Sequence, residues 1–346
     1  MQDKSILSDI VTPLLYWYAS EKRELPWRED RDPYHIWISE IMLQQTRVEA
    51  VKGYYTRFIE ALPTPAALAA VSDDALNKLW QGLGYYSRAR SLKKAAIEIV
   101  GKYGGSLPRT YEELRSLCGI GPYTAGAIAS IAYGLPTPAV DGNVLRVYTR
   151  LLADDRDISK QSTKDVVTAA LAAIYPSGED ASNFTQALME LGATVCVPNG
   201  APHCDTCPVA ELCRAHTLQS EQSYPHKPPK KARRIEEHTV LLLRCGDKYA
   251  IRKRGEEGLL AGLWEFPSVK GHVCAKDALA AFGITQAAHI EPTPPAKHIF
   301  THIEWHMQGY YVALAKEIPD LLFVTKEEIE GRYSIPSAFK AFLALL

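Results

Sequence analysis

The stretch LCGIGPYTAGA, residues 117–127, sets two glycines between two segments that are each expected to be helical. In the preceding TYEELRSLCGIG, Thr110 and Glu113 have the spacing of a capping box, which predicts a helix that stops at the glycines. Pro122 suits the first position of a following helix. The stretch therefore predicts two helices joined by a very short turn.

The two glycines of this turn, Gly119 and Gly121, allow another backbone to approach closely. The helix after them presents unpaired N–H groups at its start, and together these features suit a phosphate of DNA. An ordinary helix–helix turn explains the same residues equally well, so local chemistry leaves both interpretations open.

The composition is that of a globular protein with more than one core. The chain has 346 residues, of which 47% are hydrophobic, enough for two or three cores of about 100–200 residues each. The N-terminal MQDKSILSDI lacks the pattern of a signal peptide, and no apolar run approaches the ~20 residues of a membrane span. We therefore expect a cytoplasmic protein without membrane contact. The net charge of -1 does not favour a polyanionic partner, so a nucleic-acid surface would require local segregation of charge.

Helical patterns fill residues 1–215, which we expect to form one all-α domain. Apolar residues recur at helical spacing in PYHIWISEIMLQQTRVEAVKGYYTRFIEAL, and in SDDALNKLWQGL Ser72 is placed as an N-cap. The character changes at 216–235, where cations and prolines predict an extended, solvated interdomain linker, with contact to a phosphate backbone as the alternative. The cations of this linker are Lys227, Lys230, Lys231, Arg233 and Arg234.

Residues 236–346 show the period of two that is typical of strands. TVLLLRCGDKYAIRKR predicts two strands joined by a turn at Gly246–Asp247, and HIFTHIEWHMQGYYVALAK predicts two more joined around Gln308–Gly309. AKDALAAF and SAFKAFLALL predict short amphipathic helices. The second domain is therefore expected to be α+β.

Four of the seven cysteines lie in CVPNGAPHCDTCPVAELC, residues 196–213, with the spacing Cys-x7-Cys-x2-Cys-x5-Cys. Because clustered cysteines of a cytoplasmic protein are more often metal ligands than disulfides, we expect a metal centre. Four thiolates suit tetrahedral zinc and a [4Fe-4S] cluster alike, and spacing alone leaves both open.

Two carboxylates are candidates for chemistry. Glu40 lies in IWISEIML among apolar residues, where burial should raise its pKa and make it a general acid near neutral pH. A buried structural glutamate paired with a backbone group or an arginine is the alternative. Asp141, in DGNVLRVYTRLL, is placed as a helix N-cap, a position that would also hold a carboxylate at the mouth of a pocket.

Taken together, GIGPYTAGA, VDGNV, and LGATVC with its four-cysteine loop resemble the helix-hairpin-helix DNA glycosylase superfamily that carries an iron-sulfur cluster. Within it, LPWR, WISEIMLQQTRV, QGLGYYSRAR and, in the second domain, GLLAGLWEFPS are similar to the MutY family of adenine DNA glycosylases. The resemblance implies a multidomain protein, with an all-α glycosylase domain followed by an α+β Nudix-like domain. It also implies a nucleoid-associated monomer that removes adenine paired with 8-oxoguanine or guanine in double-stranded DNA, in base excision repair.

The resemblance implies a [4Fe-4S] cluster whose loop positions basic residues against DNA and is unnecessary for breaking the glycosidic bond. Its implied ligands are Cys196, Cys204, Cys207 and Cys213. The first interval has seven residues where the family more often has six. The same resemblance implies that Gly119 and Gly121 contact the DNA backbone.

For catalysis, the resemblance implies that a neutral Glu40 protonates adenine, at N7, while an oxocarbenium-like sugar develops. An ionised Asp141 would stabilise that charge, so we expect the two carboxylates to have opposed pKa shifts. Tyr123 and Asn143 would orient Asp141 and the sugar. Bifunctional relatives carry a nucleophilic lysine where this chain has Tyr123, and because a phenol cannot form the imine, we expect no efficient β-lyase step.

The target base must leave the duplex, and side chains must fill or wedge the gap. The resemblance implies Gln45 and Tyr85 as the wedge with Leu43 and Leu83 beside them, for which plain core packing is the alternative. The substrate-binding residues implied in the first domain are Arg28, Leu43, Gln45, Thr46, Leu83, Tyr85 and Gln186, of which Arg28 and Gln186 line the adenine pocket.

The second domain resembles the Nudix fold of the 8-oxoguanine triphosphate pyrophosphatases. Their acidic helix is absent, since HVCAKDALAAFGI follows Gly271, and without those glutamates Mg²⁺ has no ligands. We therefore expect no nucleotide hydrolysis. The related domain of the MutY family recognises 8-oxoguanine through a Phe-Ser-His segment, which reads Phe300, Thr301 and His302 here and keeps the hydroxyl.

Two alternative functions are an endonuclease III-like pyrimidine glycosylase/lyase and a catalytically silent DNA-binding iron-sulfur protein. Tyr123 and the extra domain argue against the first. Retention of both Glu40 and Asp141 argues against the second.

Overall fold

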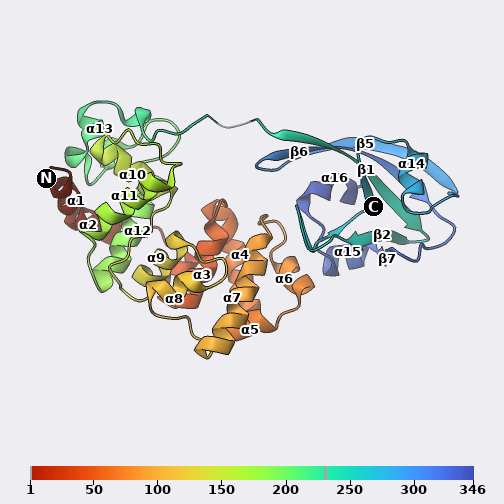
Figure 1. Ribbon diagram of the computed structural model, residues 1–346, viewed down its shortest axis with the longest axis horizontal. Coiled ribbons are helices and arrows are strands. Elements are labelled where there is room, and N and C mark those ends of the chain that lie inside the picture. Colours follow the sequence, from red (N-terminus) through yellow and green to blue (C-terminus); the bar gives the residue numbers. More distant parts are fainter. Residues whose placement is uncertain (1, 230–231) are drawn as a thin grey trace. The chain divides into compact units, whose positions relative to one another are not determined.

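A computed structural model describes residues 2–229 and 232–346, which form two compact units, each treated separately below (Figure 1). The first unit contains the described residues up to Ala70 together with Ser91–Pro229. The second contains Val71–Arg90 and the described residues from Ala232 onward. Lys230 and Lys231 of the expected linker lie outside the described residues.

The regular secondary structure of the first unit's described residues is helical, which confirms the expected all-α architecture. No helix in 2–229 or 232–346 combines the length and apolar character needed to cross a membrane. The helices of the first unit are α1 (Gln2–Asp9), α2 (Val11–Glu21), α3 (Pro33–Leu43), α4 (Val48–Ala61), α5 (Pro65–Ala70), α7 (Ser87–Tyr103, which starts in the second unit), α8 (Tyr111–Ser116), α9 (Pro122–Ile131), α10 (Gly142–Leu152), α11 (Gln161–Ala172), α12 (Glu179–Thr194) and α13 (Arg214–Thr217), with 3-10 turns at Pro26–Arg28, Cys204–Thr206, Ala210–Leu212 and Glu221–Ser223.

Helices α8 and α9 form the helical hairpin predicted from residues 117–127. The hydroxyl of Thr110 caps α8, as expected. Gly119 has a φ of +77°, and a Cβ added there would lie 2.6 Å from the Cβ of Ser91, so a side chain is excluded on both grounds. A Cβ on Gly121 would meet nothing within 4 Å. The fold therefore requires only the first of the two glycines.

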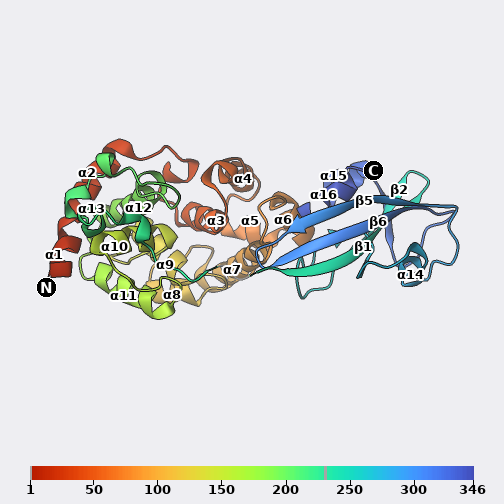
Figure 2. The same cartoon turned by 90° about the horizontal axis from the view of Figure 1, so that it is seen from above.

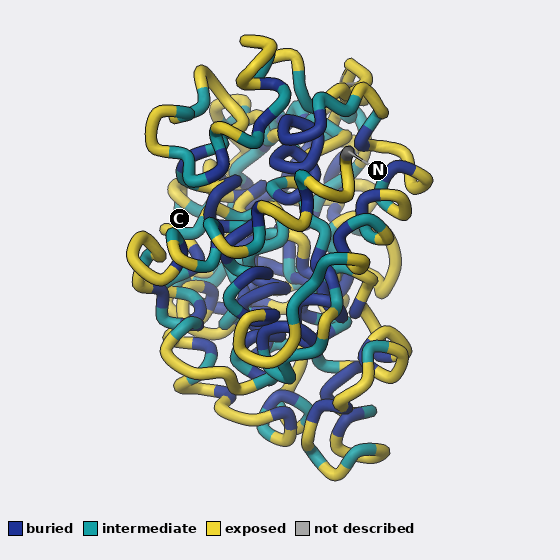
Figure 3. Tube along the Cα trace, turned by 90° about the vertical axis from the view of Figure 1, so that its left-hand side faces the viewer, coloured by how far each residue is buried: buried dark blue, intermediate teal, exposed yellow. Residues whose placement is uncertain are grey.

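Helices α9 and α10 form the buried centre of the first unit. Residues 124–131 of α9 and 144–152 of α10 are all buried. The apolar residues of α10 pack with those of α2 and α12 in one cluster. Figure 3 shows such buried stretches in the interior and exposed stretches mainly at the periphery. These two helices therefore provide a rigid support for residues at their ends.

The segment expected to be an extended linker is partly folded onto the first unit. The backbone carbonyls of Glu221 and Tyr224 accept hydrogen bonds from Arg150 at 2.9 and 3.2 Å. The carbonyl of His226 accepts one from the amide of Ile158 at 3.2 Å. The structure differs from the expectation because the buried guanidinium of Arg150 requires acceptors, which this segment supplies.

The second unit is a mixed sheet with helices, which confirms the expected α+β class. Its main strand order is β3-β2-β1-β6-β5, with β4 paired to β1 and β7 to β2. Strands β1 and β6 are parallel, and β1, β5 and β6 run side by side in both ribbon views (Figures 1 and 2). The elements are α6 (Asp73–Leu79), β1 (Arg234–Cys245), β2 (Lys248–Lys253), β3 (Trp264–Glu265), β4 (Ser268–Lys270), α14 (Ala275–Ala280), β5 (His289–Ile299), β6 (Ile303–Ala313), β7 (Leu322–Thr325), α15 (Lys326–Arg332), a 3-10 turn at Ser337–Phe339, and α16 (Lys340–Leu343).

Alternate residues of β1 enter two separate cores, because successive side chains of a strand point to opposite faces. Val240 and Leu242 pack in a cluster that includes residues of α15 and α16. Leu241 and Leu243 pack in a cluster that includes residues of α14. The sheet is therefore covered on both faces, which is why the central stretch of β1 is continuously apolar.

One of the two predicted strand connections is correct and the other is wrong. The turn between β1 and β2 lies at Gly246–Asp247, as predicted. The turn between β5 and β6 lies at residues 300–302 and not at Gln308–Gly309, which belongs to β6. A Cβ on Gly309 would lie 2.6 Å from Cε1 of Phe342, so this glycine serves close packing inside a strand and does not mark a turn.

Val71–Arg90 belongs to the second unit, although its helical pattern led us to place it in the first domain. The hydroxyl of Ser334 donates to the carbonyl of Asn77 at 3.1 Å, and the amide of Gln81 donates to the carbonyl of Ile335 at 2.9 Å. Helical periodicity reports that a segment has an apolar face but not which element covers that face. The segment therefore groups with the second unit through contacts that the pattern does not contain.

Replacing Gly309 by alanine should destabilise the second unit by about 1–3 kcal/mol, because the added methyl group overlaps packed atoms. Gly331 of α15 is the matched control, since a Cβ there meets nothing within 4 Å, and alanine should stabilise its helix by up to about 1 kcal/mol. Hydrogen exchange of β1 and β6 peptides across a urea series measures both effects. Equal protection in the two variants would contradict the packing argument.

Candidate active site and metal centre

A cavity of about 1400 Å³ in the first unit brings together many of the predicted site residues. Its walls include residues of α3, α8, α9, α10, α11 and α12 and of the segment before α3, so it lies where several distant sequence segments converge. The predicted residues that line it are Arg28, Glu40, Leu43, Gln45, Thr46, Tyr123, Asp141, Asn143 and Gln186.

Glu40 is the buried acid of this cavity. Its neighbours in α3 are buried from Ile36 to Met42, and the residue itself is 6% exposed. Burial, with a smaller contribution from the charge of Asp141, raises its pKa to about 7, while the hydrogen bond from Tyr123 and the charge of Arg28 act in the opposite direction. Glu40 is therefore protonated in a large fraction of molecules at neutral pH.

Asp141 is the N-cap of α10 and is supported by hydrogen bonds. Its Oδ1 accepts from the amide of Val144 at 2.8 Å, and its Oδ2 accepts from Nδ2 of Asn143 at 2.7 Å. Burial raises the pKa of Asp141, and these hydrogen bonds act against that rise. The expectation of opposed pKa shifts is wrong, because burial moves both carboxyls upward. What distinguishes them is that Asp141 accepts more hydrogen bonds, which favour its ionised form.

Asn143 is held in turn by Arg146. Oδ1 of Asn143 accepts from Nη2 of Arg146 at 2.8 Å, and the same guanidinium donates to the carbonyls of Gly192 and Cys196 at 2.6 and 2.8 Å. A Cβ on Gly192 would lie 2.5 Å from the Cβ of Asn143, so glycine is needed for α12 to approach α10. The orientation of Asn143 therefore depends on both helices.

Tyr123 contacts the carboxyl of Glu40, whereas we expected it to contact that of Asp141. Its hydroxyl donates to Oε2 of Glu40 and lies 3.9 Å from Sδ of Met189. Burial and the nearby negative charges raise the pKa of Tyr123 well above its ordinary value, so the phenol remains protonated. Its hydrogen bond goes to Glu40 because Tyr123, at the second position of α9, faces α3, and its expected role in orienting Asp141 stays a prediction.

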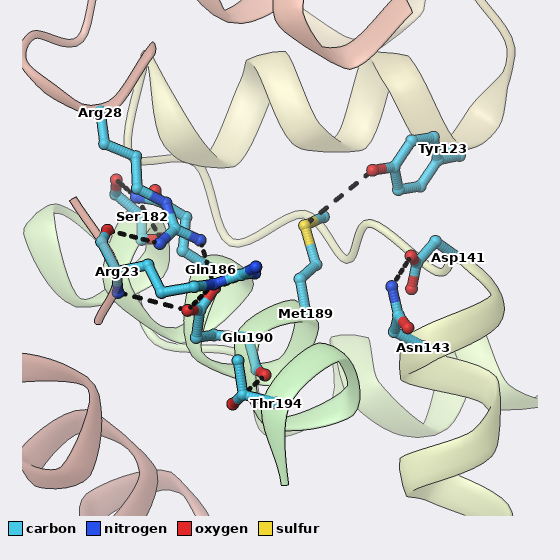
Figure 4. Close-up of polar contacts among 10 residues, drawn as sticks. All are labelled: Arg23, Arg28, Tyr123, Asp141, Asn143, Ser182, Gln186, Met189, Glu190 and Thr194. Atoms are coloured by element: carbon cyan, nitrogen blue, oxygen red, sulfur yellow. Dashed lines mark hydrogen bonds and ion pairs between the residues drawn. The ribbon is translucent and has the colours of Figure 1, made fainter. Parts of the chain in front are cut away.

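An ion-pair group that the sequence did not predict forms another wall of the cavity. Glu190, 1% exposed, accepts from Nε of Arg23 at 2.5 Å and from Nη2 of Arg28 at 2.8 Å. Burial alone would raise the pKa of Glu190, but the two arginines outweigh it and lower the pKa. Figure 4 shows both arginines converging on Glu190, with Met189 between this group and Tyr123.

Glu190 carried a signal in the sequence that we did not use. It lies in ALMELGA among apolar residues, as Glu40 does in IWISEIML, and it is four residues after Gln186 on the same helix. Gln186 itself makes long contacts of 3.4 Å to Ser182, on the cavity side of α12. An acid among apolar residues of a helix therefore indicates this site at two positions, Glu40 and Glu190.

The remaining residues predicted to bind substrate belong to the second unit. Leu83 is 6% exposed, so core packing is its role in the structure and it has little surface to offer a ligand. The hydroxyl of Tyr85 is hydrogen-bonded to Oγ1 of Thr301, which lies beside Phe300 and His302 between β5 and β6. The sequence did not indicate that Tyr85 would meet Thr301.

Gln45 and Tyr85 share an unusual backbone conformation. Their φ values are +58° and +47°, in the left-handed region that residues other than glycine seldom adopt. Gln45 lies two residues after the end of α3 at the cavity, and Tyr85 is 43% exposed. Such conformations cost free energy and cluster at functional sites.

The four clustered cysteines fit a metal centre. Each of Cys204, Cys207 and Cys213 has its pKa raised by burial and further by the charges of other cysteines in the group, to about 11 for Cys204 and about 12 for Cys207. All four are free thiols close enough to interact. Four thiolates so close together would repel one another, so a bound cation is needed to keep the cysteines deprotonated. Four cysteine sulfurs suit a metal ion or an iron-sulfur cluster.

Two charged residues flank the cysteine loop. Nη1 of Arg150 donates to Sγ of Cys196 at 3.2 Å. On another side, Sγ of Cys204 lies 3.6 Å from Oε1 of Glu221, which is also 2.6 Å from Nδ1 of His216. The loop is therefore held by a cation at one cysteine and contacted by a carboxylate at another.

Two family models match the chain. Residues 38–173 match the HhH-GPD superfamily of base excision DNA repair proteins, and residues 238–345 match the NUDIX domain. Three similar relatives are adenine DNA glycosylases. That of Homo sapiens is 37% identical, with 88% of this chain and 67% of the relative covered. That of Schizosaccharomyces pombe is 33% identical, with 92% and 85% covered, and that of Buchnera aphidicola is 34% identical, with 88% and 86% covered.

Solved structures resemble the helical part of the chain. A thermostable thymine-DNA glycosylase is 27% identical with a TM-score of 0.55, covering 62% of this chain and 98% of its own. A non-covalent endonuclease III–DNA complex is 27% identical with a TM-score of 0.52, covering 62% and 97%.

Removing the phenol of Tyr123 should raise the pKa of Glu40 further above 7, because the hydrogen bond from Tyr123 stabilises the carboxylate. The test is a ¹³C NMR titration of glutamate-labelled protein for wild type and Tyr123→Phe, with Glu40→Gln to assign the signal. Tyr175→Phe is the control, since Tyr175 bonds to Thr185 instead. A Glu40 signal that titrates near 4.5 in wild type would contradict the analysis of burial.

Proposed function

This chain belongs to the adenine DNA glycosylases of the helix-hairpin-helix superfamily, and from that membership we propose that its target is adenine paired with 8-oxoguanine or guanine in double-stranded DNA. It is a DNA glycosylase that removes adenine in base excision repair, and DNA is its partner. The observation that carries the proposed mechanism is the presence in one cavity of a carboxyl with a pKa of about 7 and a hydrogen-bonded carboxylate, Glu40 and Asp141.

Glu40 acts as the general acid. Adenine leaves deoxyribose poorly as an anion, so a proton donated to N7 lowers the barrier as the glycosidic bond breaks. A carboxyl with a pKa near 7 is matched to that transfer at neutral pH. Tyr123 holds Oε2 of Glu40 and so selects the orientation of the carboxyl. After proton transfer, the deprotonated Glu40 activates the water that completes hydrolysis.

Asp141 stabilises the positive charge that develops on the sugar. Its two carboxylate oxygens are held by Val144 and Asn143, so the group needs no reorganisation when the oxocarbenium-like ion forms. Asn143 fixes Asp141, with Arg146 behind it. The division of labour between acid and stabiliser follows from the hydrogen bonds of each carboxyl.

The reaction ends with base removal. The phenol of Tyr123, with its raised pKa, cannot form the imine by which a lysine cleaves the strand. This observation disfavours an endonuclease III-like glycosylase/lyase, although the helical part resembles endonuclease III. The buried Glu40 beside an ionisable Asp141 likewise disfavours a catalytically silent DNA-binding protein.

Adenine binds on the side of the cavity formed by Arg28 and Gln186. The ion pair with Glu190 and a hydrogen bond from Nη1 to the carbonyl of Arg23 at 3.1 Å fix the guanidinium of Arg28 at the wall of the cavity. Gln45 and Tyr85 wedge the duplex while adenine is flipped out, with Leu43 and Thr46 beside Gln45. Their strained backbones support this role. Gly119 and Gly121 contact the DNA backbone at the start of α9.

The base opposite adenine is read by Phe300, Thr301 and His302 together with Tyr85. The hydrogen bond between Tyr85 and Thr301 brings two hydroxyls to one point on the surface of the second unit. Hydroxyls donate and accept, so this pair suits the altered edge of 8-oxoguanine.

The cofactor is a [4Fe-4S] cluster held by the four cysteines of the loop. The shared influence of their charges supports a common site, and membership of the helix-hairpin-helix DNA glycosylases favours a cluster over zinc. When bound, the cluster stabilises the loop and takes no part in breaking the glycosidic bond. Arg150 would donate a hydrogen bond to the sulfur of Cys196 in that state.

Excision of adenine should require alkali for strand cleavage and should slow at high pH. In single-turnover assays on a duplex with one A:8-oxoguanine pair, breaks should appear only after hot alkali, and Asp141→Asn should abolish them. Because only protonated Glu40 is an acid, the rate should fall about tenfold per pH unit above a pKa of about 7. Breaks without alkali, or a rate that rises through pH 7, would contradict the mechanism.

Replacing Thr301 by valine should reduce the preference for adenine opposite 8-oxoguanine over adenine opposite guanine by about 2–10-fold, the value of one hydrogen bond. Valine keeps the shape and removes the hydroxyl that bonds to Tyr85. Thr301→Ser is the matched control and should keep the preference. The ratio of the single-turnover rates on the two duplexes measures this preference. An unchanged ratio in Thr301→Val would show that the hydroxyl of Thr301 does not recognise the opposite base.

A further inference from the structure

The cysteine loop carries a second set of donor atoms at Cys204. Among the described residues, the ligand atoms of Cys204, His216 and Glu221 all lie within 4.8 Å of one another. A thiol, an imidazole and a carboxylate are all groups that bind transition metals. Neither His216 nor Glu221 belongs to the four-cysteine motif.

Glu221 is fixed beside the sulfur of Cys204. Its Oε1 lies 3.6 Å from Sγ and 2.6 Å from Nδ1 of His216, which orients the carboxylate. The 3-10 turn at Glu221–Ser223 is anchored by Arg150, which donates to the carbonyl of Glu221 at 2.9 Å. The carboxylate therefore approaches the loop from a segment that is itself tied to α10.

Cys204 differs from Cys196 and Cys213 in the group that its sulfur contacts. Sγ of Cys196 accepts from the cation of Arg150, and Sγ of Cys213 lies 3.3 Å from a backbone carbonyl. In the part of the chain that the structure describes, Cys204 is the cysteine of the four whose sulfur contacts a carboxylate. The side chain of Glu221 is 19% exposed, so it is largely shielded from competing water.

We propose that Glu221 is a reserve ligand for the iron that Cys204 holds in the [4Fe-4S] cluster, taking that corner when the bond from iron to sulfur is lost. This rests on the cofactor proposed above. Carboxylate oxygen binds iron in protein sites, and a second-shell hydrogen bond such as that from His216 orients a ligating carboxylate.

The exchange balances without an oxidant or reductant. The bond between iron and Sγ breaks, the thiolate leaves with its electron pair and takes a proton from water, and an electron pair of Oε1 forms the new bond. One anionic ligand replaces another, so the charge and oxidation state of the cluster are unchanged. In a chain without the Cys204 thiol, the carboxylate occupies the corner from the start.

The test compares iron and inorganic sulfide content and visible absorption of the purified full-length chain. Cys204→Ala should keep most of its cluster, and Cys204→Ala with Glu221→Gln should lose it several-fold. Cys207→Ala should lose its cluster whether or not Glu221 is changed, because among the described residues the carboxylate contact is made by Cys204 and not by Cys207. Equal loss from Cys204→Ala and Cys207→Ala, or no effect of Glu221→Gln in the Cys204→Ala chain, would overturn the proposal.

A second measurement keeps all four cysteines and so avoids variants that fail to fold. Loss of iron to a chelator should be several-fold faster in Glu221→Gln than in wild type. The reason is that glutamine cannot replace the carboxylate as a ligand when the iron loses its bond to Cys204. Glu211→Gln is the matched control, an exposed acid of the same loop, and should match wild type. Equal rates in all three would overturn the reserve-ligand role alone. Wild type without iron and sulfide would overturn the proposed cofactor, and this proposal with it.

Discussion

Helix α10 imposes the constraint on which the first unit depends. Asp141 caps its start, and Arg146 and Arg150 follow one helical turn apart on a side that faces the cysteine loop. Two buried guanidinium groups would be very costly without acceptors, so the backbone around Cys196 and the segment near Tyr224 must fold against them. Helix α10 therefore contributes both to the wall of the cavity and to the support of the cysteine loop.

The cavity shows how one environment gives two carboxyls different tasks. Burial raises the pKa of both Glu40 and Asp141, which is a cost to the fold because each would be solvated in the unfolded chain. Asp141 recovers part of that cost through hydrogen bonds from Val144 and Asn143, and Glu40 receives one from Tyr123. In the mechanism proposed here, the acid is thus the carboxyl that accepts fewer hydrogen bonds, and the stabiliser is the one at the helix terminus.

The second unit combines the Nudix-like sheet with a helical segment from early in the chain. Val71–Arg90 contributes α6 and the strained Tyr85, whose hydroxyl meets Thr301 at the turn between β5 and β6. These two residues are 216 positions apart in sequence. Their hydrogen bond joins the segment around Tyr85 to the segment 300–302, two motifs that the sequence alone does not connect. Recognition of the opposite base is therefore a property of this unit as a whole, in the function proposed here.

The sequence by itself determined the helical hairpin, the caps at Thr110 and Asp141, the two fold classes and the cysteine group, because capping, periodicity and spacing act between residues a few positions apart. It also singled out Glu40, since an acid among apolar neighbours is visible locally. Only the tertiary structure decided which groups meet. The partner of Tyr123 is 83 positions away and that of Glu190 is 167, and the β5–β6 turn was misplaced because a glycine needed for packing resembles one needed for turning. Such pairings follow from the burial of whole helix and strand faces, which no short window of sequence contains.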